Sequence, residues 1–322
     1  MKNATKIEKL KARFPSTNKK RKQAEETIVS RALATHIAEN VLSRTPDGAA
    51  NWLARSIVPA IPLDSEWHNA LRRLVNALRS ADCSGVFNLH GNVKLPDFAA
   101  FSTLPGFTCP GAGACLDFCY SYKAWRYPGA FVRQVLATVA MRNWAPSVAE
   151  QFRALPIGIH VRLYVDGDFD SVSTLRFWLD LVRERADLRV YGYSKSWDLF
   201  VSLDDSGYRF PSNYVLNLSS GSIHENALRD RISAIVKENG KRLVRGQFVA
   251  VGIDGKLDNG ARIPRGAERY NSAEYHERVR DSALVAYGQR AFSCPGHCDS
   301  CGKGKHVCGN ENANVLIAIG IH

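Results

Sequence analysis

Strand-like and helix-like segments alternate over the second half of the sequence, and this alternation constrains the fold most. Strands that alternate with helices pair in parallel, because each helix returns the chain to the same end of the sheet. We therefore expect an α/β fold with a mainly parallel sheet that closes partly into a (β/α) barrel. Hydrophobic periodicity predicts helices over 130–142, 170–185 and 225–237, and strands over 159–165, 188–193, 214–218, 247–253 and 314–321.

The N-terminal region differs from this pattern in composition. Residues 1–22 contain nine Lys or Arg and one Glu, a sum of +8 out of a net charge of +12 for the chain. We interpret residues 1–24 as a flexible basic arm, which favours binding to the phosphates of DNA or RNA. A solubility or localisation tail is the alternative. Residues 25–85 are predicted to form a helical extension, with helices over 26–43 and 67–79 and a loop between them.

The remaining chain divides into an α/β cluster-binding domain over 86–290 and a Cys-rich metal site with a terminal strand over 291–322. The sequence contains no apolar run of 18 residues, and its N-terminus is polar. We therefore expect no membrane partner and a cytoplasmic location.

Seven of the eight cysteines fall into two tight groups, which favours metal or iron–sulfur binding over disulfides in a chain of this size. The first group is Cys109, Cys115 and Cys119, with the spacing C-x5-C-x3-C. Three thiolates can hold three irons of a [4Fe–4S] cluster and leave the fourth iron open, whereas zinc would need a fourth ligand from elsewhere. This favours iron–sulfur over zinc. Glycines at 111 and 113 suit a loop that wraps closely, because glycine tolerates positive φ.

The second group supplies four cysteines and completes a site by itself. Either Zn²⁺ or a second [4Fe–4S] cluster satisfies that ligand number, and the spacing does not choose between them. The eighth cysteine, Cys83, stands alone and is expected to be buried without a metal. The members of the second group are Cys294, Cys298, Cys301 and Cys308.

Small polar residues follow three successive predicted strands. Ligand sites of α/β proteins lie at the carboxyl ends of parallel strands, so these residues are candidate cofactor contacts. Asp166 and Asp170 lie beside them. Each of these residues also has a purely structural interpretation. The aspartates are then helix caps in a tight turn, and Lys195 is an ordinary surface lysine. The predicted cofactor-binding residues are Gly167, Asp168, Ser194, Lys195 and Ser219.

Several of these motifs together resemble a phage and mobile-element family named after gene product 88. The resemblance rests on segments 90–95 (HGNVKL), 104–120 (LPGFTCPGAGACLDFCY), 162–170 (RLYVDGDFD), 193–196 (YSKS) and 294–302 (CPGHCDSCG). It implies an iron–sulfur protein of a mobile genetic element.

A more distant resemblance is to radical S-adenosylmethionine enzymes, in which a three-cysteine loop follows the first strand of a partial barrel. It implies S-adenosylmethionine as a cofactor and an electron donor as a partner. The spacing C-x5-C-x3-C differs from the C-x3-C-x2-C of those enzymes.

We therefore expect radical S-adenosylmethionine-like chemistry at the three-cysteine cluster of a mobile-element protein, with no catalytic residue assigned. One alternative is a non-catalytic iron–sulfur protein that binds nucleic acid or has a regulatory role. A zinc-stabilised interaction module is the other.

Overall fold

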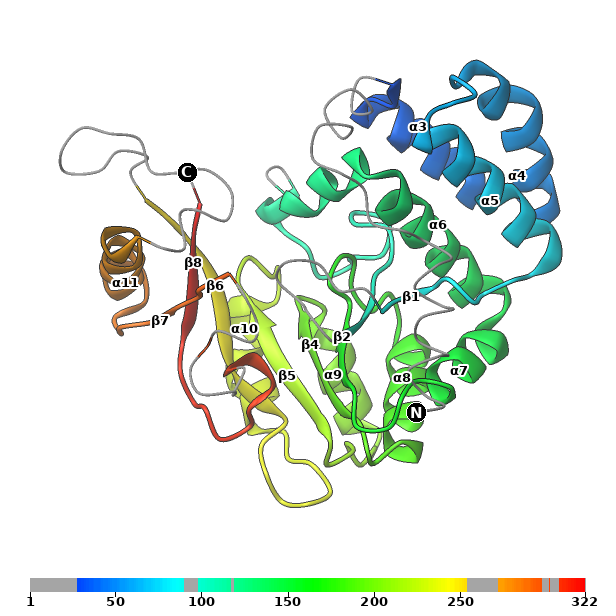
Figure 1. Ribbon diagram of the computed structural model, residues 1–322. Coiled ribbons are helices and arrows are strands. Elements are labelled where there is room, and N and C mark those ends of the chain that lie inside the picture. Colours follow the sequence, from blue (N-terminus) through cyan, green and yellow to red (C-terminus); the bar gives the residue numbers. More distant parts are fainter. Residues whose placement is uncertain are drawn as a thin grey trace.

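The computed structural model describes residues 28–89, 98–116, 119–253, 272–296, 301 and 307–321, and an eight-stranded sheet forms its centre (Figure 1). The strands lie in the order β1-β2-β3-β4-β5-β6-β8-β7, and β1 is antiparallel to β2 whereas all other neighbours are parallel. This confirms the α/β fold with a mainly parallel sheet. The strands are β1 (Phe87–Asn88), β2 (Phe98–Phe101), β3 (His160–Leu163), β4 (Arg189–Ser194), β5 (Tyr214–Ser219), β6 (Val244–Gly252), β7 (Phe292–Ser293) and β8 (Ile317–Ile321).

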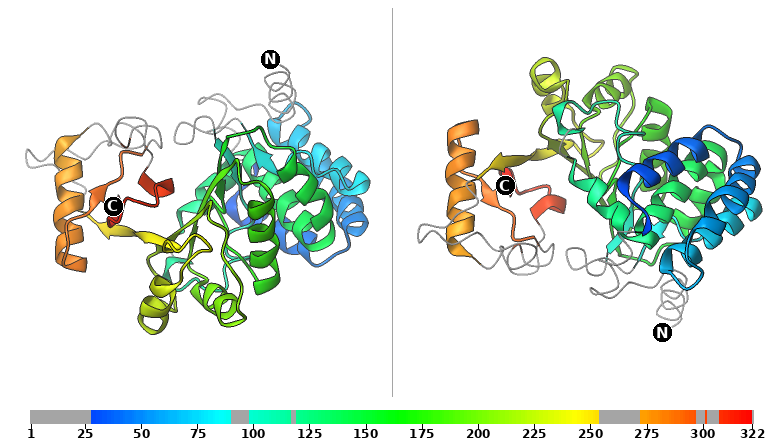
Figure 2. Two further views of the ribbon diagram at one scale, coloured as in Figure 1. Left: turned by 90° about the horizontal axis from the view of Figure 1, so that it is seen from below. Right: turned by 90° about the horizontal axis from the view of Figure 1, so that it is seen from above.

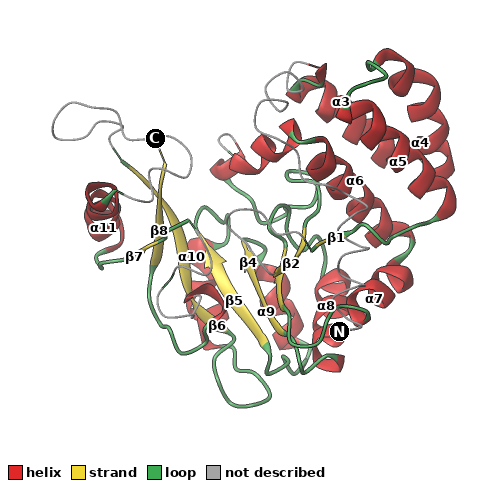
Figure 3. Ribbon diagram, viewed as in Figure 1, coloured by secondary structure: helices red, strands yellow, loops and turns green. Residues whose placement is uncertain are grey.

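From β2 to β6, each strand lies next to its predecessor in the chain, so every crossover moves one place in the same direction. Right-handed crossovers then place the connecting helices on one face of the sheet (Figure 3). Among the described strands, β1 and β7 are the two edges, and their pairings do not close a barrel. The helices after β2 are α6 (Pro128–Asn143), α7 (Ala145–Arg153), α8 (Val172–Glu184), α9 (Trp197–Asp205), α10 (Glu225–Ala234) and α11 (Ala273–Tyr287).

The N-terminal extension is helical, as predicted, and it packs onto the α/β part. The segment predicted as a loop between its two helices is itself helical, because Thr45 caps a new helix and Pro46 occupies its first position. Buried residues of the extension and of the helical face of the sheet form one continuous core cluster. The elements are α3 (Arg31–Leu42), α4 (Pro46–Trp52), the π turn η1 (Leu53–Ile57), the 3-10 turn η2 (Val58–Ala60) and α5 (Glu66–Ser80).

The other face of the sheet carries a smaller cluster, and the end of the second cysteine group packs on it. The 3-10 turn η6 (Val307–Gly309) contacts β4 there, and it brings Cys308 against the strands (Figure 1). We call this the inner face. Beyond it, α11 packs on β6 and β8 at the end of the sheet opposite the N-terminal helices (Figure 2). The strand residues of the inner-face cluster are Phe98, Ala100, Tyr191, Val215 and Ile317.

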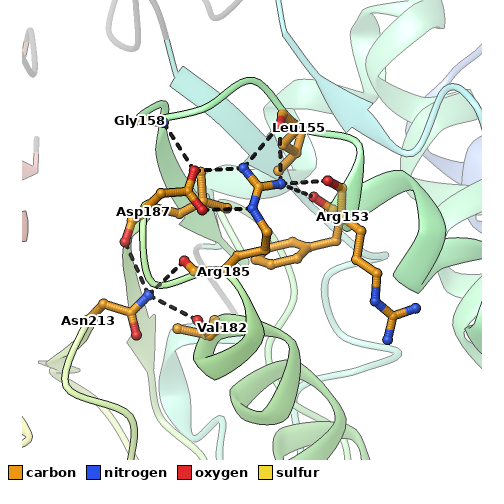
Figure 4. A network of polar contacts seen from close by, with 9 residues as sticks. Arg153, Leu155, Gly158, Val182, Arg185, Asp187 and Asn213 are labelled. Carbon is orange, nitrogen blue, oxygen red and sulfur yellow. Dashed lines mark hydrogen bonds and ion pairs between the residues drawn. The ribbon is translucent and has the colours of Figure 1, made fainter.

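A polar network at the amino ends of the strands fastens α7 and α8 to the sheet (Figure 4). The Arg185 guanidinium donates to the carbonyl oxygens of Arg153 and Leu155, at 2.6 and 3.2 Å, and to both carboxylate oxygens of Asp187, at 2.7 Å. The Asn213 amide donates to three carbonyls, including that of Val182 at 2.9 Å. Side chains thereby donate hydrogen bonds to carbonyl groups at the ends of α7 and α8, which lack partners within the helices.

This network predicts an acid-dependent loss of stability. The hydrogen bond from Arg185 lowers the pKa of Asp187 to about 2, below its value in an unfolded chain. A lowered folded-state pKa means that the stabilisation is complete above the unfolded pKa and is lost as the pH falls towards the folded one. Asp187→Asn is expected to cost about 1 kcal/mol at pH 6 and progressively less below pH 4.

Urea unfolding at pH 6, 4 and 3 measures this effect. Asp170→Asn, which removes an exposed carboxylate outside the network, is the control. A cost for Asp187→Asn that stays constant with pH would contradict the prediction.

Candidate metal centre at the strand ends

The first cysteine group lies in the loop that follows β2, the first of the parallel strands. The start of this loop is held by two hydrogen bonds. The Thr103 amide donates to the carbonyl of Asp166, after β3, at 3.0 Å, and the Leu104 amide donates to the hydroxyl of Thr138, on α6, at 3.0 Å. The loop is therefore fixed to the carboxyl end of the neighbouring strand.

Two glycines seat the same loop on the carboxyl ends of β4 and β5. A Cβ atom on Gly111 would lie 2.1 Å from the carbonyl oxygen of Lys195, so only glycine fits at this contact. The Gly111 carbonyl accepts from the Ile223 amide at 3.1 Å, and the Gly113 amide donates to the Gly221 carbonyl at 3.1 Å. Neither Gly111 nor Gly113 has a positive φ. The close wrap that we predicted is present, but its cause is the approach of another backbone and not a left-handed conformation.

The three thiols of the loop share one neighbourhood. Burial raises the pKa of Cys109 to about 12, and the nearby Asp168, Cys119 and Cys115 raise it further against a backbone hydrogen bond at Gly106. Burial also raises the pKa of Cys115, although Lys195 lowers it in part. Such thiols are protonated at neutral pH, so a metal must displace their protons when it binds.

Asp168 ties the ends of β3 and β4 together. Its carboxylate is buried and accepts from the Ser194 hydroxyl at 2.8 Å and from the Lys195 and Ser196 amides at 2.7 and 3.3 Å. Burial raises its pKa in spite of these bonds. Both carboxylate oxygens are thus engaged within the protein, and Asp168 positions the turn that carries Lys195. A direct contact from Asp168 to a cofactor stays a prediction.

The other predicted cofactor residues also meet at this edge. The Lys195 ammonium donates to the Ser219 hydroxyl at 2.7 Å and interacts with Cys115. Gly167 has φ +78, and a Cβ atom on it would lie 2.0 Å from the Thr103 hydroxyl oxygen. The structure therefore brings all five predicted residues to the cysteine loop. We call Cys109, Cys115, Cys119 and these five residues the strand-end site.

A buried polar chain beneath the loop was not predicted. The Trp125 indole donates to the side-chain carbonyl of Gln134 at 2.9 Å, and the Gln134 amide donates to the Asp166 carboxylate at 2.9 Å. Gln134 and Thr138 are both buried, whereas the other buried residues of α6 are apolar. Two polar residues four positions apart on the buried face of a helix were the available sequence signal.

The backbone is strained at the same edge of the sheet, where the parallel strands end. Tyr164, the residue after β3, has φ +52, which costs a non-glycine residue about 1–2 kcal/mol. Its hydroxyl accepts from the Trp178 indole at 3.1 Å, and its ring packs on that of Phe169 with centroids 4.4 Å apart. Buried packing thus holds the turn that leads into Asp166 and Asp168.

The second cysteine group is described in part, because Cys298 lies outside the described residues. Cys294 and Cys308 both pack in the inner-face cluster. The Gly296 amide, in a turn with φ +75, lies 3.4 Å from the Cys294 sulfur and donates to it. Cys301 lines a cavity of about 620 Å³ beside α11. The other lining residues are Ala273, His276, Arg280, Ala291, Phe292, Ser293 and Pro295.

Within the described ranges, no three Cys, His, Asp or Glu side chains gather closely enough for a single metal ion. A [4Fe–4S] cluster bonds each cysteine to a different iron, so its ligands are spaced more widely than those of one zinc ion.

None of the seven described cysteines forms a disulfide. Burial and Asp82 raise the pKa of Cys83 to about 11, and it packs in the main core.

Comparison with known proteins identifies a family. The model of the family described as gene product 88 matches residues 70–306, well over half of the chain. This range includes the first cysteine group and most of the second. No curated protein and no solved structure matches the chain. In the part of the chain that the structure describes, no helix is long and apolar enough to cross a membrane.

Proposed function

The chain belongs to the gene product 88 family, and we propose that it is an iron–sulfur protein of a mobile genetic element with radical S-adenosylmethionine-like chemistry. Cys109, Cys115 and Cys119 would hold a [4Fe–4S] cluster. One observation carries the proposal. The three-cysteine loop directly follows the first parallel strand and is seated, through Gly111 and Gly113, on the carboxyl ends of the next strands.

The strand order supports the same proposal. Sequential parallel strands with helices on one face are the arrangement of a partial (β/α) barrel, and the cysteine loop lies at the carboxyl ends, where such folds place their sites. Between the first two cysteines, residues 111–113 pair with residues 221–223, so backbone contacts hold this part of the loop.

A cluster with one open iron supplies a binding point for the amino and carboxylate groups of S-adenosylmethionine and the electron that cleaves its sulfonium. The protein supplies the surroundings. Lys195 offers a cation to a carboxylate, and Ser219 holds the Lys195 ammonium in place at 2.7 Å. Asp168 fixes the backbone of Lys195, and Gly167 lets the loop approach β3 closely.

Iron and acid-labile sulfide, measured per chain after anaerobic purification, test the first part of the proposal. About four irons indicate one cluster, and about eight indicate two. Colourless protein that contains only zinc would overturn it, since d¹⁰ zinc has no visible charge-transfer absorption. Release of 5′-deoxyadenosine and methionine from S-adenosylmethionine under dithionite tests the second part. An intact cluster that leaves S-adenosylmethionine uncleaved favours a non-catalytic iron–sulfur protein.

A second candidate function is nucleic-acid binding, and a specific contact favours it. Helix α3 packs on the 3-10 turn η4 (Tyr120–Arg126), which follows Cys119 directly. The Arg31 guanidinium lies 4.0 Å from the centre of the Tyr122 ring. The described chain thus begins beside the segment that follows the cysteine loop, and the basic arm over 1–24 lies outside the described residues. We propose that the arm holds DNA or RNA through its phosphates.

Deletion of residues 1–22 is expected to weaken binding to a mixed-sequence DNA duplex and to flatten its salt dependence. The deletion removes +8 of charge. If about five of the basic residues contact phosphates, the slope of log affinity against log salt falls by about 4 to 5 units. A salt titration of full-length and truncated protein measures the slopes. Equal slopes, with both proteins folded by circular dichroism, would exclude the arm as a nucleic-acid element.

A further inference from the structure

The exposed face of helix α5 carries positive charge and no carboxylate. This helix packs on α4 and α6, and these contacts bury its apolar face (Figure 1). Among the fifteen residues of α5, all of which the structure describes, Glu66 is the only acidic one, and it is half-buried in the first turn. We call the six exposed residues the α5 face. They are Asn69, Arg72, Arg73, Asn76, Arg79 and Ser80.

Arginines on other helices of the chain have acidic partners in the same helix. On α10 and α11, an arginine pairs with a glutamate four residues before it, at 2.5 and 2.8 Å. Such pairs stabilise a solvated helix. On the α5 face, asparagines stand four residues from two of the arginines, and the third, Arg79, donates to the side-chain oxygen of Asn51 on α4 at 3.2 Å. The helix itself therefore does not balance the charge of this face, which favours an anionic partner.

The asparagines lie between the arginines on this face. Successive residues of an α-helix are about 100° apart around its axis, so residues seven apart lie nearly on one line. Asn69 and Asn76 form such a line along the middle of the face. Arg72 and Arg79 form a second line on one side of it, and Arg73 lies on the other side. Cations thus flank a central row of amides.

This arrangement fits the major groove of a DNA duplex. The groove is about 12 Å wide and admits an α-helix, so cations on the flanks of the helix reach phosphates while amides between them reach base edges. The major groove of duplex RNA is too deep and narrow for this contact. A membrane-binding helix buries its apolar face in lipid, whereas the apolar face of α5 is buried within the protein.

We propose that the α5 face binds duplex DNA in the major groove, with its arginines on phosphates and with Asn69 and Asn76 directed at base edges. The inference rests on the second candidate function only in taking nucleic acid as the partner. It places the contact on a folded helix, and it does not depend on the basic arm, the cysteine loop or S-adenosylmethionine.

The salt dependence of DNA binding by the full chain tests the contact with phosphates. Each phosphate contact contributes about 0.9 to the slope of log affinity against log salt. The triple variant Arg72→Gln, Arg73→Gln and Arg79→Gln should therefore lower the slope for a mixed-sequence duplex by about 2 to 3 units. Lysine at the same three positions keeps the charge and should restore most of the slope.

The matched control removes the same charge at the other end of the molecule. Arg278→Gln, Arg280→Gln and Arg290→Gln replace three arginines that pair with glutamates, and together they should change the slope by less than about 1 unit. An equal loss in the two triple variants would overturn the inference, because net charge would then determine the binding. An unchanged slope in the α5 variant, or no binding of duplex DNA by the wild type, would also overturn it.

A second variant tests the contact with bases. Asn69→Ala together with Asn76→Ala should reduce the discrimination between duplexes of different A·T content at an unchanged slope, because the asparagine amide pairs with adenine and releases no counterion. Unchanged discrimination, or an equal effect of the arginine substitutions on a duplex RNA of the same sequence, would overturn docking in the major groove. If deletion of the arm lowered the slope and the α5 variant did not, this inference would fail and the second candidate function would stand.

Discussion

Replacing Cys115 with serine is expected to lower the iron content of anaerobically purified protein by about four atoms per chain, with an equal loss of sulfide. Cys115 lies where the cysteine loop meets β4 and β5, between Cys109 and Cys119 in the chain and close to Lys195. A serine hydroxyl does not replace a thiolate as a ligand of a cluster that has only three protein ligands. Cys109→Ser and Cys119→Ser should have the same effect, since each would remove one of the three.

Cys83→Ala is the matched control, because Cys83 is equally a thiol of raised pKa but packs in the main core. Its iron content should equal that of the wild type. If Cys83→Ala lost iron while Cys115→Ser retained it, the ligand set would be wrong.

Gly111→Ala is expected to destabilise the protein by about 2–3 kcal/mol and to impair cluster loading. The added methyl group would lie 2.1 Å from the carbonyl oxygen of Lys195 and 2.6 Å from the amide nitrogen of Ser196. Both neighbours are backbone atoms, so they cannot turn aside as a side chain would. The Lys195 carbonyl accepts from the Ser222 hydroxyl, and the Ser196 amide donates to the Asp168 carboxylate. The loop must move away from β4, and its thiols must move with it. The midpoint of urea unfolding and the iron content of the same preparation measure the two effects.

Gly129→Ala is a control for which the expected change in stability has the opposite sign. Gly129 is the second residue of α6, and a Cβ atom on it would contact nothing within 4 Å. Alanine there should stabilise the protein by about 0.4–1 kcal/mol, chiefly because the unfolded chain loses conformational freedom. If both substitutions stabilised the protein, the seating of the loop on β4 would be incorrect.

The periodic elements could be predicted because one of their faces is buried and the other is not. The segment 170–185, for example, contains α8, and Ser171 caps that helix. Strand β2 could not be predicted in this way, because all four of its residues are buried and leave no alternation. This omission mattered for function, since β2 places the cysteine loop after the first parallel strand.

The strand-end site could be predicted in outline because the carboxyl ends of parallel strands share one edge of a sheet. That rule brings Asp168, Lys195 and Ser219 together. It does not say which of them point at one another, and the engagement of the Asp168 carboxylate by three neighbouring residues at the end of β4 needed the tertiary structure.

The position of β8 also affects how the protein is made in a cell. This strand follows β7 in the chain but lies between β6 and β7 in the sheet. About 65 residues separate the end of β6 from the start of β8, so at about 5–20 residues per second a ribosome needs roughly 3–13 s to synthesise them. During that interval β6 presents an unpaired edge, and Val249 and Val251 lack the packing that β8 later supplies. Nascent chains should therefore be most exposed to aggregation, and most dependent on chaperones, just before this last strand emerges.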